Sequence, residues 1–189
     1  MALYKESLLH TIDDDLAGRN QNWEDLDDHI ADFENHLEEK PSDGVHGMKF
    51  MGALVQMSEA QNISSSSFTT LQWGTEVYDT DNIFDPDNPT RLTVPAGVSV
   101  VRITTNITFA SNATGGRRLQ TLKNGAAHSG RLYVAYQAMS GADTRIYAAT
   151  PPLQVAPGDY FELQVYQDSG STISILAQTA TWFALEVII

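Results

Sequence analysis

The clearest hydrophobic pattern in the chain is a strict alternation of residue types between positions 159 and 167. The apolar positions are Phe161, Leu163 and Val165, and each intervening position carries a polar or amphipathic side chain. A period of two predicts a β-strand with one buried face and one outward face. We interpret the preceding Pro157–Gly158–Asp159 as a turn in which Asp159 accepts backbone hydrogen bonds, rather than as the acidic corner of an active site.

The same period recurs from residue 69 to the end of the sequence, where short runs rich in Val, Ile, Thr, Tyr and Phe alternate with turn residues. We predict strands at residues 70–78, 90–94, 98–109, 117–123, 131–139, 144–149, 159–167, 171–178 and 181–188. No window of this region has helical periodicity. The predicted fold class is therefore mainly β, a Greek-key or jelly-roll sandwich over residues 69–189.

A different period governs the N-terminal segment, where larger apolar side chains recur at intervals of three and four residues. Heptad positions a and d are then occupied by Leu9, Ile12, Leu16, Arg19, Trp23, Leu26, Ile30, Phe33 and Leu37. So narrow a stripe predicts an α-helical, coiled-coil stalk or anchor within residues 1–43, weakened near Gly18 and followed by a connector at residues 44–68. The alternative is a helical hairpin, or an exposed helix without a partner.

Charge divides the chain at the same place as periodicity does. The sequence has 24 acidic and 11 basic side chains, a net charge of −13, and residues 1–43 hold 13 of the acidic ones. Nucleic-acid binding needs a basic face, so this composition argues against it. The chain has no cysteine, and its apolar runs are shorter than the roughly 20 residues of a membrane helix. We therefore expect neither disulfides nor membrane insertion.

The sequence lacks the motifs of common catalytic sites, since it has no G-x-S-x-G, no H-E-x-x-H and no glycine-rich phosphate loop. We expect a protein that is not an enzyme and that needs no cofactor. The acidic stretch YDTDNIFDPDN, residues 78–88, leaves two interpretations open. Either Asp79 and Asp81 belong to a calcium site, or the stretch is an Asp-, Asn- and Pro-rich turn at a strand end. It lacks the glycine and the glutamate of an EF-hand loop.

Four segments resemble, in order, the globular head of the C1q and tumour-necrosis-factor-like superfamily: ITTNITFASNAT, RRLQTLKNG, LQVAPGDYFELQVYQ and TWFALEVII. The resemblance covers about residues 69–189 and implies a jelly roll that assembles as a tight homotrimer on a trimeric stalk. Some such trimers bind calcium near their axis. The chain has no Gly-X-Y repeat, so the heptad segment takes the place of a collagen stalk. The trimer contacts implied are Leu26, Ile30, Phe33, Leu37, Tyr160, Tyr166 and Trp182.

Similar heads are frequent on bacteriophage and spore-surface fibres, and residues 19–36, RNQNWEDLDDHIADFENH, resemble anchoring segments of small phage fibre proteins. These resemblances imply a virion protein, made in the host cytoplasm, that docks to a capsid, collar or tail protein and contacts a host-surface glycan. The receptor contacts expected in loops 79–89, 112–117 and 140–145 are Asp85, Asp87, Asn112, Arg117, Asp143 and Arg145. The alternatives are a purely structural capsid decoration or head-fibre protein, and a bacterial C1q-like surface protein.

Overall fold

Antiparallel β-strands make up nearly all the regular structure in the computed structural model, which describes residues 50–127 and 133–188. The strands are β1 (Gly52–Gln56), β2 (Gln61–Ile63), β3 (Thr69–Thr70), β4 (Thr75–Asp79), β5 (Arg91–Thr93), β6 (Val100–Phe109), β7 (Gly116–Lys123), β8 (Ala126–Ala127), β9 (Tyr133–Gln137), β10 (Thr144–Ala149), β11 (Leu153–Gln154), β12 (Tyr160–Gln167), β13 (Ile173–Ile175) and β14 (Trp182–Val187). A 3-10 turn, Gln178–Ala180, precedes β14. These ranges contain no helix that is long and apolar enough to span a membrane. The prediction of a mainly β fold is confirmed.

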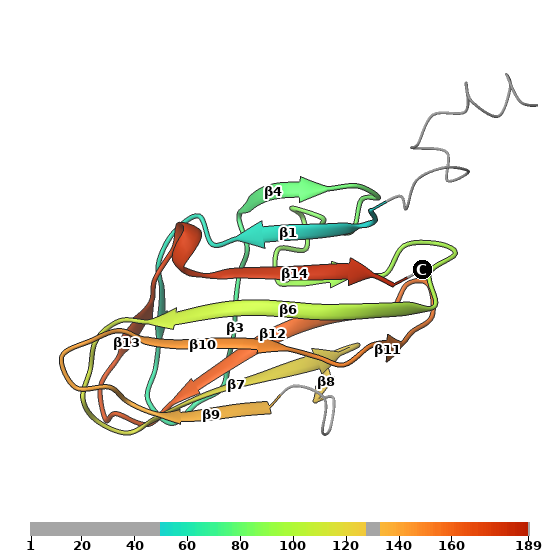
Figure 1. The fold of residues 1–189 in the computed structure, drawn as a ribbon. Helices are drawn as coiled ribbons and strands as arrows, with labels where there is room; N and C mark the ends of the chain where they lie inside the picture. The colour runs from blue at the N-terminus through green and yellow to red at the C-terminus, as the bar shows by residue number, and fades with distance from the viewer. Residues whose placement is uncertain (1–49, 128–132, 189) are drawn as a thin grey trace, which may run out of the picture. The chain divides into compact units, whose positions relative to one another are not determined.

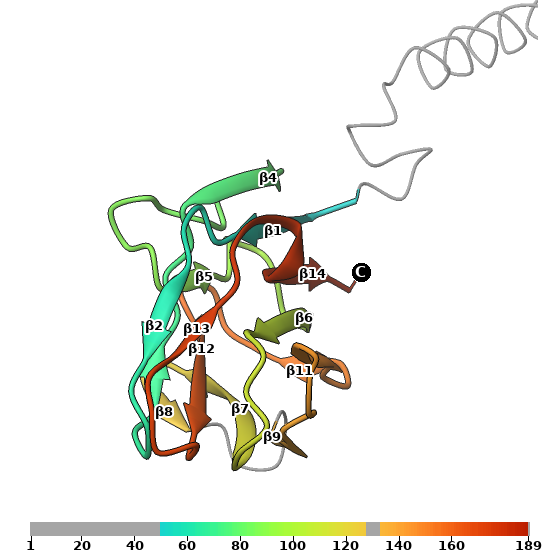
Figure 2. The ribbon, with the colours of Figure 1, turned by 90° about the vertical axis from the view of Figure 1, so that its left-hand side faces the viewer.

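The strands form two sheets that pack face to face (Figure 1). In the first, which we call sheet A, the order is β2-β13-β6-β14-β1-β4, and β10 and β11 also pair with β6. In the second, sheet B, the order is β3-β12-β7-β8, with β5 beside β12 and β9 beside β7. Figure 2 views this sandwich from the end at which β6 and β12 finish, and it shows β2 running beside β13.

The core lies between the two sheets and is built by alternation along their central strands. Apolar side chains from both sheets fill it, among them Ile103, Ile107, Phe183 and Leu185 of sheet A and Leu119, Phe161, Leu163 and Val165 of sheet B, all fully buried. Burying one such side chain stabilises the fold by about 1.5–3 kcal/mol. The alternation predicted for residues 159–167 is confirmed, because its apolar positions face this core.

A two-residue turn at Asn124 and Gly125 connects β7 to β8, as the sequence predicts. Their φ angles are 53° and 75°, the left-handed conformation that Asn and Gly adopt at low cost in tight hairpins. The Asn124 side chain also reaches the start of β12. Its Oδ1 accepts the Tyr160 N–H at 2.9 Å, and its Nδ2 donates to the Asp159 carboxylate at 2.7 Å. The turn therefore joins two strand connections of sheet B.

Residues 52–63, which the sequence assigns to a connector, form two strands of sheet A. β1 lies between β14 and β4, and β2 pairs with β13. Val55 and Ile63 are fully buried. The connector prediction was wrong here because strands of five and three residues, separated by only four residues, are too short to show a readable period. The jelly roll consequently starts at about residue 50 rather than 69.

Two other sequence predictions concern the strand at residues 70–78 and the heptad segment at residues 1–43. The predicted strand 70–78 is divided into β3 and β4, and the segment between them buries Leu71 and Trp73. The heptad segment at residues 1–43, with Leu26, Ile30, Phe33 and Leu37, lies outside the described residues. Its coiled coil stays a prediction.

Replacing Ile63 with alanine tests whether the β1–β2 region belongs to the core. We expect the free energy of unfolding to fall by about 2–5 kcal/mol, because the side chain is fully buried and its truncation leaves a cavity. Urea denaturation measures the difference. Ser64→Ala, at the exposed neighbouring position, is the control and should change stability by less than about 0.5 kcal/mol. Equally small effects of both substitutions would contradict the core assignment.

Candidate functional site

The outward side of sheet A carries apolar and aromatic side chains, with the polar Thr104 and Asn106 of β6 among them. Strand register places Asn106 of β6 opposite Tyr147 of β10 on one side and opposite Trp182 of β14 on the other. Residues directly opposite one another in antiparallel strands share a face of the sheet. The Tyr147 and Trp182 rings meet edge to face, with centroids 6.0 Å apart. Tyr147 is 63% exposed, so this contact leaves most of its ring open to solvent.

A second row on the same face runs beside the first. It consists, in strand order, of Ala149, Thr104, Ala184, Leu54 and Tyr78. Phe50, just before β1, packs edge-on against Tyr78 with ring centroids 5.4 Å apart, and it stays 55% exposed. We call the two rows together the aromatic face, with the members Phe50, Leu54, Tyr78, Tyr147, Ala149, Trp182 and Ala184.

Charged side chains lie at the margins of the aromatic face. Glu186 is opposite Arg102 at one end, and Arg145 is exposed beside Tyr147 at the other. Partial burial, together with the nearby Glu186 charge, raises the pKa of Tyr78. Its hydroxyl is therefore neutral at physiological pH. A neutral centre with a polar rim is the usual anatomy of a protein–protein interface.

The structure separates the aromatic residues that the sequence groups at a trimer interface. Trp182 lies on the aromatic face, whereas Tyr160 and Tyr166 lie on the outward side of sheet B. The Arg91 guanidinium lies over the Tyr160 ring, with its Cζ 4.8 Å from the ring centroid. The Arg118 guanidinium lies over the Tyr166 ring in the same way, at 4.7 Å. Both tyrosines thus have cation–π partners within the chain. One flat contact surface cannot include them together with Trp182.

Four loops gather at the end of the sandwich where β6 and β12 finish, and we call this end the tip. The loops are residues 64–68, 110–115, 138–143 and 168–172. The Ala138 N–H donates to the Gly115 carbonyl, and the Gly170 N–H donates to the Ser65 hydroxyl, both at 2.9 Å. These bonds connect loops that are far apart in the sequence.

Part of the predicted receptor set is found at the tip. Asn112 and Asp143 lie in its loops, and Arg145 is the second residue of β10. Asp85 and Asp87 lie elsewhere, exposed in the connection between β4 and β5. The structure therefore brings the predicted loops 112–117 and 140–145 together and leaves the loop 79–89 outside this group.

Arg117, also predicted as a receptor contact, is buried beneath the tip, and that prediction is corrected. It faces inward on β7 and is 0% exposed. Its guanidinium donates at 3.0–3.1 Å to the carbonyl oxygens of Asn112, Thr114 and Gly116. Burial lowers the pKa of Arg117, and the charge of Asp168 opposes this. Arg117 holds the loop 110–115 from inside and is not available to a partner.

The acidic stretch 78–88 folds as a turn organised by Asp79. Its Oδ1 accepts the N–H groups of Asp81 and Ile83 at 3.1 and 3.0 Å, and its Oδ2 accepts that of Phe84 at 2.7 Å. These bonds match the turn interpretation. Among the described residues, no three acidic or histidine side chains gather closely enough to hold a metal ion. The calcium interpretation of Asp79 and Asp81 stays a prediction.

Asp159 satisfies donors of the turn before β12, as predicted. Its carboxylate accepts the Ala156 N–H at 2.8 Å and the Asn124 amide at 2.7 Å, and it pairs with the Lys123 ammonium at 2.7 Å. The Ala156 N–H, then the side chains of Asn124 and Lys123, lower the pKa of Asp159 to about 2. Gly158, with φ of 85°, supplies the left-handed turn position. This corner has a structural role.

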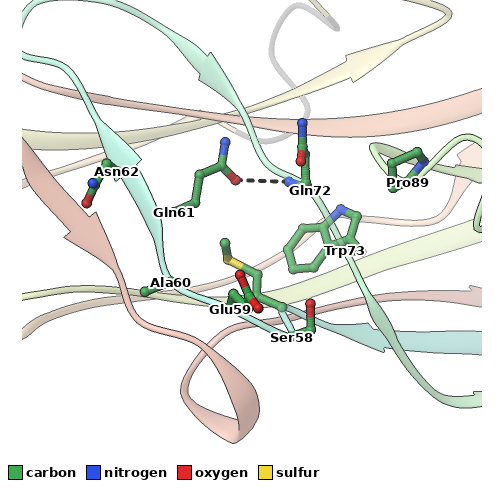
Figure 3. A pocket seen from close by; sticks show the side chains of 9 residues that line it. Ser58, Glu59, Ala60, Gln61, Asn62, Gln72, Trp73 and Pro89 are labelled. Atoms are coloured by element: carbon green, nitrogen blue, oxygen red, sulfur yellow. Dashed lines mark hydrogen bonds between the residues drawn. The ribbon is translucent and has the colours of Figure 1, made fainter.

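A pocket of about 350 Å³ opens beside Trp73 (Figure 3). Its walls come from the β1–β2 connection, from β2, from the segment between β3 and β4, and from the β4–β5 connection. The lining residues are Met57, Ser58, Glu59, Ala60, Gln61, Asn62, Gln72, Trp73 and Pro89. Sequence reasoning missed this pocket because most of its residues lie in the predicted connector. They carry no motif that could have indicated a site.

Comparison with known proteins bears on the fold. Murine APRIL at pH 5.0 is similar with a TM-score of 0.56 and 11% identity, over 74% of this chain and 100% of that one. Murine APRIL at pH 8.0 gives 0.51 and 13%, over 72% and 99%. Eiger TNF from S. frugiperda gives 0.48 and 15%, over 74% and 93%. No protein-family model and no curated protein matches the sequence. The APRIL likenesses show a TNF-like jelly roll, the fold that the sequence resemblance implied.

Replacing Arg117 with methionine tests its role beneath the tip. We expect a loss of about 1.5–3 kcal/mol of unfolding free energy, because three loop carbonyls lose a charged donor inside the protein. Thermal and urea denaturation give the value. Arg118→Met is the matched control, since that side chain is 40% exposed and its removal should be nearly neutral. Equal stability of the two variants would contradict a buried structural role.

The Asp159 carboxylate makes stability depend on pH. Its pKa is about 2 in the folded protein, against 3.8 for an ordinary aspartate, so its contribution is complete above about pH 4 and is lost as pH falls towards 2. We expect Asp159→Asn to flatten the fall in unfolding free energy within this window. Urea denaturation at a series of pH values measures it. Asp87→Asn, in an exposed turn, is the control, and identical pH profiles of the two variants would refute the assignment.

Proposed function

We propose that this chain is the subunit of a homotrimeric fibre or appendage of a bacteriophage virion. The N-terminal helices anchor it to a capsid, collar or tail protein, and the jelly-roll head contacts the host surface. The aromatic face is the observation that carries the self-association on which this proposal rests. The proposal assigns the head a binding role and no catalytic reaction.

The composition of the aromatic face supports self-association. Tyr147 and Phe50 are 63% and 55% exposed, although each already packs against another aromatic ring. Contiguous exposed apolar patches on a soluble protein mark contact sites, and tyrosine and tryptophan are enriched at the centres of such sites. The small exposed side chain of Ala149, two residues from Tyr147 on β10, lets a partner approach the sheet closely.

The distribution of exposed apolar groups favours a cyclic assembly over a two-fold dimer. At the β4 edge of sheet A the exposed residues are Phe50 and Val77, and at the β10 edge they are Met139 and Tyr147. The two edges differ, so one subunit can present the β10 edge to the β4 side of the next. A head-to-tail contact of this kind closes into a ring when the rotation between subunits is a whole fraction of a turn. A trimer is the ring that the C1q- and TNF-like resemblance implies.

The N-terminal segment supports the anchoring part of the proposal. Its a/d stripe between Leu9 and Leu37 needs a partner to cover it, and residues 19–36 resemble phage fibre anchors. The dense acidic charge of residues 1–43 repels between neighbouring helices. Docking into a capsid, collar or tail protein, or attachment to a trimeric head, would hold such helices together.

Tip loops are a suitable place for host contact. Asn112, Asp143 and Arg145 lie there, on or beside loops whose sequence can vary without disturbing the core. Three copies on one trimer can gain about 10²–10⁴ in apparent affinity without a stronger individual contact. A weak interaction with a host glycan is then sufficient for attachment.

Tyr147→Lys in the full chain tests the aromatic face. We expect the mass measured by light scattering to fall from three times 20.7 kDa to the monomer mass. The reason is that an apolar contact would remove the hydration of the lysine ammonium group without giving it a partner, which makes assembly unfavourable. Tyr133→Lys is the matched control. Tyr133 is 55% exposed but lies on the edge strand of sheet B, so this variant should remain a trimer.

A wild-type chain that stays monomeric at all concentrations would overturn the trimer. Trimers from both variants would show that the aromatic face is not the contact. Labelled protein on bacterial cells tests attachment separately, with the monomeric variant expected to lose most of the binding through loss of avidity. Absence of wild-type binding to any host envelope fraction would leave a structural role only.

A further inference from the structure

Strand β9 forms an open edge of sheet B (Figure 1). It pairs with β7 on one side, and no other strand of the described residues pairs with its second side. Four of its five side chains are exposed, and only Val134 packs partly against the core. An unpaired edge presents a row of backbone N–H and C=O groups that can pair with another strand.

The direction of the β9 backbone groups follows from the ladder with β7. The Ala138 N–H, just after β9, donates to the Gly115 carbonyl on the β7 side at 2.9 Å, and β9 pairs with β7 without a register shift. Backbone groups of successive residues point to opposite sides of a strand, so every second residue before Ala138 is bonded to β7. The residues in between direct their N–H and C=O groups away from β7, and they are Tyr133, Ala135 and Gln137.

The other edges of the two sheets carry features that prevent strand pairing. β4 holds Glu76 and Asp79, and its ladder with β1 contains a register shift. β10 holds the exposed Arg145, and the remaining edge strands of the described residues have two or three residues each. Charges, bulges and short length are the usual protection of an edge. β9, with the sequence YVAYQ, has none of them.

The β9 strand is complementary to itself. Antiparallel pairing of two copies around Ala135 places Tyr133 opposite Gln137 of the second copy and Val134 opposite Tyr136. The outward-directed residues then face one another as hydrogen-bonded pairs, each of which exchanges two backbone hydrogen bonds. An aromatic side chain opposite a β-branched one adds favourable side-chain contact. Neither strand brings a charge to this contact.

The two arginines of β7 leave the β9 edge uncharged. Arg117 is buried, and its guanidinium donates to loop carbonyls. Arg118 is opposite Ala135, but its guanidinium lies over the Tyr166 ring of β12, which is on the other side of β7 from β9. We propose that β9 pairs antiparallel with β9 of a second copy of this chain, which joins the two B sheets into one.

This contact goes beyond the proposed fibre and does not depend on it. A three-fold axis does not relate two strands by a two-fold rotation, so the β9 pair would join neighbouring trimers rather than subunits of one trimer. Only five residues of each chain take part, so free heads associate weakly through it. Heads held side by side pair more readily, because their effective concentration is higher.

A disulfide can trap this weak contact, because the chain has no cysteine of its own. In the full-length Ala135→Cys variant the two cysteines would meet at the two-fold axis, with Cα atoms about 5.5 Å apart, a separation that suits a disulfide. We expect mild oxidation to give a covalent dimer roughly tenfold faster than with Ala96→Cys. Ala96, exposed in the turn before β6, is the matched control for random collision. Non-reducing gel electrophoresis measures both rates.

The register of the pair has its own test. Tyr133→Cys and Gln137→Cys chains should form a mixed disulfide dimer when they are combined. Either chain alone should not, because its own cysteines would be about 14 Å apart along the two strands. Disulfides between like chains in place of the mixed dimer would contradict the antiparallel pairing around Ala135.

Proline at residue 137 tests the backbone of the edge. In the Ala135→Cys chain, Gln137→Pro removes an N–H that points away from β7, so the ladder with β7 stays intact while the pair loses a donor from each chain. We expect disulfide formation to fall to the rate of the Ala96→Cys control. Gln137→Ala, which keeps the N–H, is the matched control and should retain most of the rate. Urea denaturation checks that both variants are folded.

Equal rates for Ala135→Cys and Ala96→Cys would overturn the β9 contact, and so would an unchanged rate in a folded Gln137→Pro variant. Failure of the proposed function looks different, since light scattering and cell binding report on the trimer and on attachment. The Tyr147→Lys chain, expected to be monomeric, should still form the disulfide dimer when it carries Ala135→Cys. A protein that forms this dimer but neither trimerises nor attaches to cells would retain the β9 contact and refute the fibre.

Discussion

Packing of sheets A and B across one apolar layer is the constraint on which the rest of the molecule depends. Phe183 and Leu185 of β14 face inward. Because side chains alternate along a strand, Trp182 and Ala184, which precede them, have to face outward. The register of β14, β6 and β10 then brings Trp182 to Tyr147. A slip of one residue would exchange the core for the aromatic face. The core therefore determines the contact surface through which we propose that the chain assembles.

Buried polar side chains shape the loops that this core leaves open. Arg117 holds the loop 110–115 through three carbonyl oxygens, and Gln167 donates to the carbonyls of Ile63 and Ser171 at 3.1 and 2.7 Å. At the opposite end the half-buried Asp159 accepts hydrogen bonds from the Ala156 N–H and the Asn124 amide. In each case the loop conformation depends on a side chain that has its partners within the protein. The indole Nε1 of Trp73 and the Nε of Arg117 are buried without such a partner.

Sequence reasoning predicted the long strands and the turns between them, because both have strong local signals. β6 and β12 alternate over eight or more residues, and Asn124–Gly125 has the composition of a hairpin turn. β1 and β2 were missed, since a strand of three to five residues becomes recognisable only when its neighbours are known. Arg117 was misjudged for a related reason: a charged residue in a strand is normally exposed, and only its three carbonyl partners make burial tolerable.

The sequence by itself determined the class of fold and the identity of the inward positions, because period-two burial is a local property of an extended chain. It also determined that the Asp159 carboxylate would accept a backbone hydrogen bond in the turn before β12. Tertiary structure decided which outward residues become neighbours. Tyr78, Tyr147 and Trp182 come from three strands, and the Trp73 pocket draws on segments from residue 57 to residue 89. Such groupings depend on strand order and register between distant segments, which no local pattern contains.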